Sequence, residues 1–451
     1  MTTENGLGAS GLSTIEAPIT WKAYLVCVSA AFGGVFFGYD IGWMSGVLGM
    51  PYVIQQYTDM EYDFNAGTPA DSSHSFAIPS SDKSLMTSIL SLGTFLGAIV
   101  AGDLADLWGR RITILIGCAI FSCGVILQIS SNGQLALMTI GRLVAGLGVG
   151  FESSVIILYM SEYIRDELAE IVANHEYESL VSPDKGYVSS WLACFEGPIS
   201  KPNSNMRRTI VGAGIQGMQQ LSRMNFIFYY GTTFFQQLGT ISNPFLISLI
   251  TTLVNVLTTP LAFWTIERFA RRPLLIYGGL GMFLMQYIIG AVGTALPDNE
   301  TAVKGMIAVI CFQIFFYATT WGPAAWVVVG ETFSLPIRAR GVAISTASCW
   351  FWNCVLAVIT PYMTGDEEGA VNLGPKVFFF WGSLCLLGAL FAYFLVPEMK
   401  GLSLEQVDLM LAETSPRKSA QWAPRTTFAQ EMAHVEKTEV THIEHTDHHE
   451  V

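Results

Sequence analysis

Two kinds of polar side chain stand out because they lie inside long apolar stretches of the sequence. Asp40 and Arg142 are ionisable, and burying either alone in a bilayer costs roughly 2.5–3.5 kcal/mol on insertion scales, so each requires a partner. Gln219, Gln220 and Asn225 are amides, which donate and accept hydrogen bonds and suit a ligand rich in hydroxyl groups. Amides also hold membrane helices together. The residues alone leave ligand binding and helix packing equally favoured.

The stretches that carry these residues have the length of membrane-spanning helices. Of 451 residues, 51% are hydrophobic and 13% are charged, about half the charged fraction of a soluble domain. A helix needs roughly 20 apolar residues to cross a bilayer, and its backbone groups must be satisfied within the segment. The sequence therefore predicts an all-α membrane protein with about ten spans. They are 23–48, 85–102, 112–129, 135–160, 210–238, 244–266, 273–296, 306–330, 342–363 and 377–396.

Basic residues are distributed unequally between the two sides of these spans. Arginine pairs or clusters follow the second, sixth and eighth spans and precede the fifth, whereas the opposite connections carry only single lysines. By the positive-inside rule, both termini are expected in the cytoplasm. Asn299 begins an N-glycosylation sequon in an outer connection and is a glycosylation candidate. The N-terminal segment lacks a basic n-region, so no cleavable signal peptide is expected.

The remaining composition argues against several other functions. Much of the acid behind the net charge of −13 lies outside the apolar stretches, in 162–196 and in the C-terminal tail. No basic stripe indicates a nucleic-acid partner. The sequence shows no nucleotide-binding loop, metal signature or catalytic triad, so an enzyme, a bound metal or an organic cofactor is not expected. Most cysteines fall inside apolar stretches, as small packing residues do.

Two halves of the chain repeat the same pattern. The segment 106–111 after the second span corresponds to 267–272 after the sixth, since each has an acid three residues before a small residue and an arginine pair. Parallel repeats of this kind are typical of secondary transporters.

The two halves differ after their fourth spans. Each fourth span ends in an acid, Glu162 or Glu331. Two more spans follow Glu331, whereas 163–180 has the polar pattern of an amphipathic cytoplasmic helix. We infer a first half of four spans and a second half of six. Removing an even number of spans leaves the orientation of every later span unchanged.

Seven motifs in order give the chain a resemblance to a known family. They are Phe37-Gly38-Tyr39-Asp40, Gly102 with Asp106-Leu-Trp-Gly109-Arg110-Arg111, Gly141-Arg142-Leu-Val-Ala-Gly146-Leu-Gly148-Val-Gly150, Gln219-Gln220-Leu-Ser-Arg223-Met-Asn225-Phe-Ile-Phe-Tyr229-Tyr230-Gly231, Trp321-Gly322-Pro323-Ala-Ala-Trp326, Glu331 with Arg338-Ala-Arg340-Gly341, and Pro397-Glu398-Met-Lys400-Gly401-Leu-Ser-Leu-Glu405. Together they resemble the sugar porter branch of the major facilitator superfamily, and within it the fungal monosaccharide/proton symporters. The resemblance implies two helical bundles around a central site that work by alternating access.

The resemblance also implies which residues contact a sugar. It favours sugar binding over helix packing for the amides, and it adds polar and aromatic side chains on later spans. An indole ring against the apolar face of a pyranose is the family's use of such tryptophans, although a lone Trp in a span more often packs or anchors. The expected substrate-binding residues are Gln219, Gln220, Asn225, Asn255, Trp326, Trp350 and Asn353.

Coupling to protons is implied by the same resemblance. In proton-coupled sugar porters, an Asp at the position of Asp40 pairs with an Arg at the position of Arg142, whereas facilitative relatives commonly carry a neutral residue there. We therefore expect Asp40 to carry the proton and Arg142 to tune its pKa, with the proton as the only coupling ion. The alternative is a structural ion pair.

Charged residues at the expected cytoplasmic helix ends form the third predicted group. The family uses them as a salt-bridge network that locks the cytoplasmic side, and their positive members also determine topology. The expected gate residues are Asp106, Arg110, Arg111, Glu162, Glu267, Arg271, Arg272, Glu331, Arg338 and Arg340.

Several positions depart from the family pattern. The fifth and sixth spans, which carry a sugar-binding Gln and a Pro-Glu-Ser-Pro-Arg-like motif, have no counterpart. Arg223 and Ala270 stand where the family usually has Gly, and Met399 stands in place of Thr. The shortened chain is therefore expected to be deficient in transport.

The sequence thus predicts a major facilitator fold with an incomplete N-terminal bundle of four helices and a C-terminal bundle of six. The expected regions are a cytoplasmic segment (1–22), the truncated bundle (23–162), a linker (163–207), the second bundle (208–398) and a largely disordered cytoplasmic tail (399–451). We expect a monomeric, multi-pass plasma-membrane protein in the lipid bilayer, carrying a monosaccharide such as a hexose by proton symport. The alternative is a non-transporting sugar sensor or a truncated regulatory partner.

Overall fold

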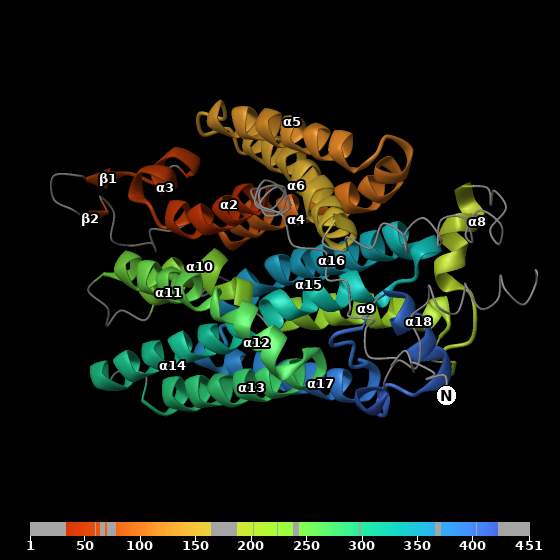
Figure 1. Cartoon of the computed structure of the whole chain (residues 1–451). Helices are drawn as coiled ribbons and strands as arrows, with labels where there is room; N and C mark the ends of the chain where they lie inside the picture. Colours follow the sequence, from red (N-terminus) through yellow and green to blue (C-terminus); the bar gives the residue numbers. More distant parts are fainter. Residues whose placement is uncertain are drawn as a thin grey trace, which may run out of the picture.

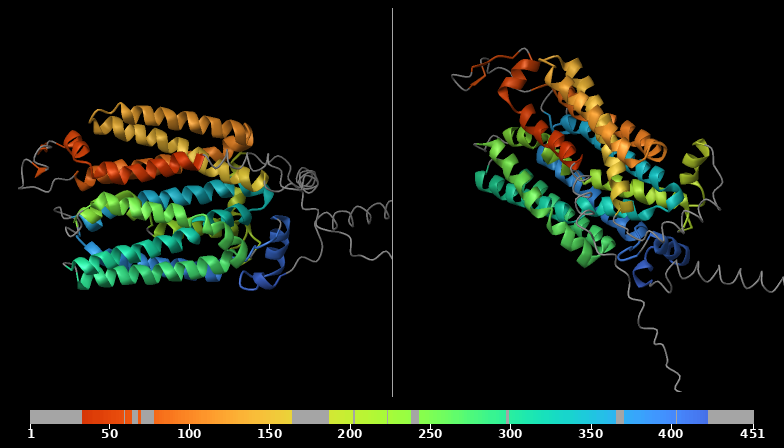
Figure 2. Two further views of the ribbon diagram at one scale, coloured as in Figure 1. Left: turned by 60° about the vertical axis from the view of Figure 1, so that its left-hand side comes forward. Right: turned by 45° about the horizontal axis from the view of Figure 1, so that its top comes forward.

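The computed structural model describes residues 33–58, 60–63, 68–69, 78–163, 187–201, 203–222, 224–237, 243–296, 299–365, 371–402 and 404–422. Within these ranges, long helices lie side by side, and those of the first half are stacked on those of the second half (Figure 1, Figure 2). The first half comprises α2 (Gly33–Leu48), α3 (Pro51–Tyr57), α4 (Ser80–Leu107), α5 (Arg110–Ile129) and α6 (Leu135–Tyr163). The second half comprises α9 (Asn205–Leu221), α10 (Met224–Gln237), α11 (Pro244–Thr258), α12 (Leu261–Phe269), α13 (Arg271–Ala295), α14 (Glu300–Thr319), α15 (Trp321–Thr332), α16 (Arg338–Thr364) and α17 (Val377–Leu395).

Shorter elements lie in the connections. They are β1 (Tyr62–Asp63) and β2 (Thr68–Pro69), α8 (Tyr187–Leu192), η1 (Ala193–Phe195), η2 (Leu335–Ile337), η3 (Gly374–Lys376), α18 (Leu404–Glu413) and η4 (Ser419–Gln421). The two strands pair antiparallel over two residues each, and they form the only sheet among the described residues.

Each of the ten predicted spans coincides with a helix or with two consecutive helices. Among the described residues, seven segments are long and apolar enough to cross a bilayer, and the pair α11 and α12, bent by 46°, makes an eighth. The first predicted span is described only from Gly33, and the fifth is divided into α9 and α10, of 17 and 14 residues. The expectation of an all-α membrane protein is confirmed.

The eighth predicted span is broken, and its sequence explains why. Pro323 has no amide hydrogen, so it cannot pair with the carbonyl of Thr319, where α14 ends. The hydroxyl of Thr265, on α12, donates to this carbonyl at 2.8 Å. In a membrane a carbonyl released at a helix break must find such a partner. The break is therefore stabilised by a specific hydrogen bond within the second half.

The first half ends after its fourth long helix. Only the 23 residues 164–186 separate α6 from α8 in the sequence, whereas two spans would need about 40. The predicted amphipathic helix at 163–180 falls in this segment and, apart from the last residue of α6, lies outside the described residues. The segment is thus too short to contain two further spans.

The beginning of the predicted disordered tail is folded. Val407, Met410 and Leu411 occupy one face of α18 and are buried against the second half. Asp408 of the same helix pairs with the buried Arg208 at the start of α9. The apolar spacing of three and four residues explains why this segment docks. Residues 423–451 lie outside the described part.

Candidate functional site

Three of the predicted amides meet at one point inside the second half. The side-chain oxygen of Gln220 on α9 accepts from the amide nitrogens of Asn225 on α10, at 2.7 Å, and of Asn353 on α16, at 2.9 Å. The amide nitrogen of Gln220 lies 3.0 Å from the sulfur of Cys349. Gln220 and Asn353 are buried. We call Gln220, Asn225, Asn353 and the hydroxyl of Ser91 described below the amide network.

A helix break brings Asn225 towards Gln220. In a continuous helix, residues five apart point about 140° away from each other. Here α9 ends at Leu221 and α10 begins at Met224, and the interruption turns Asn225 back towards the end of α9. Ser222, in the break, is buried, and Gln286 on α13 donates to its carbonyl at 2.8 Å. Arg223 lies outside the described residues.

The first half contributes a residue that sequence reasoning missed. The hydroxyl of Ser91 on α4 donates to the side-chain oxygen of Asn353 at 2.8 Å. The hydroxyl of Tyr229 approaches the same oxygen at 3.5 Å. The available signal was the stripe Ser84, Ser88 and Ser91, whose spacing of four and three places hydroxyls on one helix face. Through Ser91 the amide network connects the two halves.

The other predicted sugar contacts have separate surroundings. The amide nitrogen of Gln219 donates to the carbonyls of Trp321 and Gly322, at 3.0 and 2.7 Å, and so supports the start of α15. Trp350 is buried in the same apolar cluster as Cys349, and Trp326 packs against that cluster. Asn255 is half-buried on α11. The structure thus gathers Gln220, Asn225 and Asn353 into one network and places these four residues outside its hydrogen bonds.

The structure describes the side chain of only one member of the predicted proton-coupling pair. Arg142 on α6 is fully buried, and one of its guanidinium nitrogens lies 3.5 Å from the sulfur of Met44 on α2. Asp40 belongs to α2 one turn before Met44, and its side chain lies outside the described residues. Residues four apart share a helix face, so the guanidinium lies beside the face of α2 that carries Asp40. The pairing itself stays a prediction.

A charged cluster joins the two halves at one end of the helices, which we call the basic end. Arg340 at the start of α16 lies 3.7 Å from a carboxylate oxygen of Asp103 and 3.6 Å from one of Asp106, both near the end of α4. Arg110 at the start of α5 lies 3.8 Å from Asp106. Asp103 was missed, although its position three residues before Asp106 places it on the same face.

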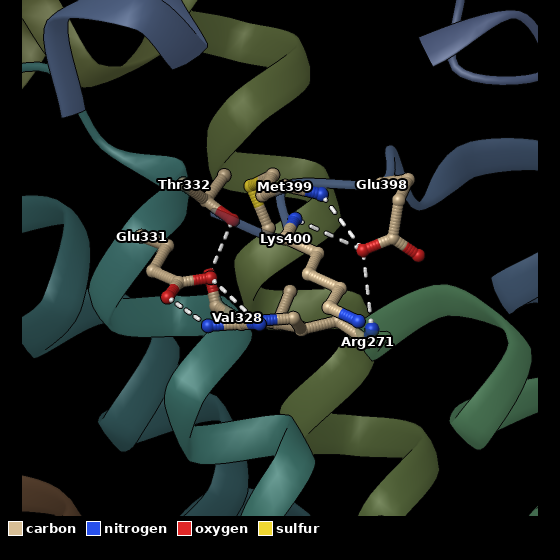
Figure 3. A network of polar contacts seen from close by, with 7 residues as sticks. All are labelled: Arg271, Val328, Glu331, Thr332, Glu398, Met399 and Lys400. Carbon is tan, nitrogen blue, oxygen red and sulfur yellow. Dashed lines mark hydrogen bonds and ion pairs between the residues drawn. The ribbon is translucent and has the colours of Figure 1, made fainter. Parts of the chain in front are cut away.

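A second cluster at the basic end lies wholly within the second half (Figure 3). Arg271 makes two contacts with Glu331, at 3.0 and 3.3 Å, as a planar guanidinium does with a carboxylate. The carboxylate of Glu398 accepts from the backbone amides of Arg271 and Arg272, each at 3.1 Å. It also accepts from the amides of Met399 and Lys400. Glu398 therefore caps the N-terminus of α13, where a negative charge is favoured.

The remaining predicted gate residues are dispersed. Arg272 donates to the carbonyl of Tyr393 at 2.7 Å, and Arg338 is buried with its Nε 3.4 Å from the carbonyl of Phe333. The side chain of Glu162 lies outside the described residues. Two further members are exposed and form no ion pair within the described part of the chain: Arg111 and Glu267.

The fold and the buried polar network define a polytopic membrane protein with a polar interior between two helical halves. The sequence model of the family described as "Sugar (and other) transporter" matches residues 26–174 and 164–411. The chain therefore belongs to this sugar transporter family. The two matches meet at 164–174, where the first half ends early.

Individual relatives agree with this assignment. The chain is 33% identical to the major facilitator-type transporter ecdD of Aspergillus rugulosus, over 90% of both chains, and 32% identical to the probable glucose transporter rco-3 of Neurospora crassa, over 86% and 79%. It is 31% identical to the high glucose sensor RGT2 of Saccharomyces cerevisiae, over 85% of this chain and 60% of the sensor. The alignment with ecdD extends over 509 positions, more than the 451 residues of this chain, so the relative has residues without a counterpart here.

Solved structures support the fold. A structure of the proton:xylose symporter XylE with a bound bromodeoxyglucose superposes with a TM-score of 0.62 at 20% identity, covering 86% of this chain and 99% of XylE. At this identity the likeness shows the major facilitator fold alone, which confirms the predicted fold class.

Proposed function

We propose that this chain binds a monosaccharide, a hexose or a related sugar, at the amide network and moves it across a membrane by alternating access. The observation behind the proposal is that Asn353 accepts from Ser91 of the first half while its nitrogen donates to Gln220 of the second. Amide and hydroxyl groups that satisfy each other can exchange these bonds for sugar hydroxyls. The names of the relatives, glucose transporters among them, support a sugar as the ligand.

The direction of access follows from the charges. We place the basic end in the cytoplasm because arginines concentrate there. The contacts of Arg340 with Asp103 and Asp106 hold that end together in this structure. At the opposite end, a shallow recess is lined by Lys83, Phe226 and other residues of α4, α10 and α16. It is the proposed entrance for the sugar.

Coupling to a proton is the finer part of the proposal. Asp40 would bind the proton, and the neighbouring Arg142 would hold the carboxyl ionised until a proton arrives. Asp40→Asn should abolish uphill sugar uptake and leave sugar exchange intact, because exchange needs no net proton movement. Uphill uptake that persists in this variant would disprove the assignment.

A second candidate function is supported by the missing spans. The first half has two spans fewer than the second, and one relative is named a high glucose sensor. The alternative is therefore a sugar-binding sensor or regulatory partner that does not transport.

One experiment separates the two candidates. Binding and uptake of labelled D-glucose are measured in cells that lack their own sugar transporters. Binding with uptake supports a carrier, binding without uptake supports a sensor or partner, and the loss of both in Gln220→Leu locates the site. Gln128→Leu is the matched control, because Gln128 is a buried glutamine of α5 outside the amide network. Absence of binding by the unaltered chain contradicts both candidates.

A further inference from the structure

The short helix α8 contacts the charged cluster that joins the two halves. The indole N–H of Trp191 on α8 donates to a carboxylate oxygen of Asp103 on α4 at 3.0 Å. The same oxygen of Asp103 lies 3.7 Å from Arg340 on α16. Trp191 and Arg340 thus share one acceptor atom, and the linker between the halves takes part in the contact between them.

The segment that carries Trp191 is fixed to the second half. The carbonyl of Cys194 in η1 accepts from the hydroxyl of Thr209 at 2.7 Å, and the carbonyl of Ala193 accepts from the side-chain amide of Asn205 at 3.0 Å. Both acceptors directly follow α8, and both donors lie in the first turns of α9. Cys194 is also fully buried in an apolar cluster with residues of α15 and α16. Trp191 therefore moves with the second half when the halves separate.

Cys194, which follows α8, interacts electrostatically with Arg340 of the ion pair. Burial raises the pKa of the Cys194 thiol to about 11, and the positive charge of Arg340 acts in the opposite direction. Arg340 also contacts the carboxylates of Asp103 and Asp106 on α4.

We propose that Trp191 is a positioning residue of the gate, whose indole N–H holds the Asp103 carboxylate in place for Arg340 and so favours the conformation closed at the basic end. The inference rests on the alternating access proposed above. Opening this end moves α4 away from α16, and it must break the bond from Trp191 together with the ion pair. A hydrogen bond to a carboxylate shifts such an equilibrium by about tenfold.

Hydrogen–deuterium exchange of the purified full-length protein tests this, and it requires neither sugar nor transport. Trp191→Phe keeps an aromatic ring and removes the donor. We expect amide exchange to rise about three- to tenfold at the end of α4 and the start of α16, with no change at the opposite end of the same helices. Failure of the proposed sugar binding would leave this result unaffected, so the two proposals are tested separately.

Two comparisons distinguish a role of Trp191 in positioning the Asp103 carboxylate from a role that only anchors the linker. Trp422→Phe removes another indole donor, which bonds to the exposed Glu413, and should leave α4 and α16 unchanged. In an Asp103→Ala background, Trp191→Phe should add nothing at these helix ends, because its target is gone. Faster exchange confined to 187–195, or equally raised at both ends of α4, would overturn the proposal. So would an undiminished effect in the Asp103→Ala background.

Discussion

The two halves carry the same motif at the basic end and complete it differently. In the second half, the N-terminus of α13 receives the carboxylate of Glu398, and Arg271 is held bidentately by Glu331. In the first half, among the described residues, no carboxylate caps the N-terminus of α5, and Arg110 meets Asp106 at 3.8 Å. Glu398 follows the sixth helix or helix pair of its half. The described helices of the first half end with the fourth long one, α6, so no described segment there corresponds to Glu398.

This difference shows that the repeated motif does not by itself satisfy the first backbone amides of the helix that it starts. The acid, the small residue and the arginine pair fix where a helix starts, while a later span satisfies its first amides. The first half depends instead on the second, through the contacts of Arg340 with Asp103 and Asp106. We therefore expect substitutions in the second half's cluster to reduce stability more than equivalent substitutions in the first half.

The largest effect is expected for Glu398→Ala. It removes the acceptor of four backbone amides, two at the start of α13 and two at Met399 and Lys400. The free energy of unfolding should therefore fall by about 3 kcal/mol. Thermal unfolding of the detergent-solubilised protein measures this. Glu413→Ala is the control, because that carboxylate is exposed and accepts from Trp422. Equal effects of the two variants would remove the basis of the comparison.

A smaller effect is expected for Arg271→Ala. The pair with Glu331 is mostly shielded, with both side chains less than one-fifth exposed, and its loss should cost about 2 kcal/mol. Arg110→Ala, at the corresponding position of the first half, affects a partly exposed side chain whose contact with Asp106 is longer, so its expected cost is smaller than that of Arg271→Ala. The same unfolding measurement compares them. The comparison fails if Arg110→Ala is the more damaging variant.

The smallest effect concerns the residue before each arginine pair. Gly109 has φ 81° and Ala270 has φ 68°, a region that favours glycine. Ala270→Gly should therefore stabilise the protein by about 0.5–1 kcal/mol. Ala291→Gly, at an exposed position within α13, should destabilise it instead. A higher unfolding temperature for Ala270→Gly alone is the expected result, and a lower one would show that the backbone there is unstrained.

The sequence predicted the spans well because length and apolarity decide them. The early end of the first half was inferred from the polar pattern of 163–180, and the length of 164–186, too short for two more spans, agrees with it. The sequence did not predict that three spans are interrupted. The signals were present at Pro260 and Pro323, but proline is tolerated within membrane helices when neighbours satisfy the freed carbonyl. Thr265 does so for the second of these breaks, and only the tertiary structure shows it.

The candidate site was predictable in its residue types and not in its pairings. Gln219 and Gln220 are adjacent and chemically identical, yet one supports the start of α15 while the other is the centre of the amide network. Ser91 and Asp103 join their clusters only because α4 lies against α16. Such contacts depend on how the halves dock, which no local pattern of residues encodes.

The central claim is that the amide network, built from both halves, binds the sugar. Equilibrium binding of labelled D-glucose to the purified protein tests it most directly, with one substitution on each side of the network. Asn353→Ala and Ser91→Ala should each weaken binding, the former by about tenfold or more, while Gln128→Leu leaves it unchanged. If glucose binds the Asn353→Ala and Ser91→Ala variants as tightly as the unaltered chain, the network is not the sugar site.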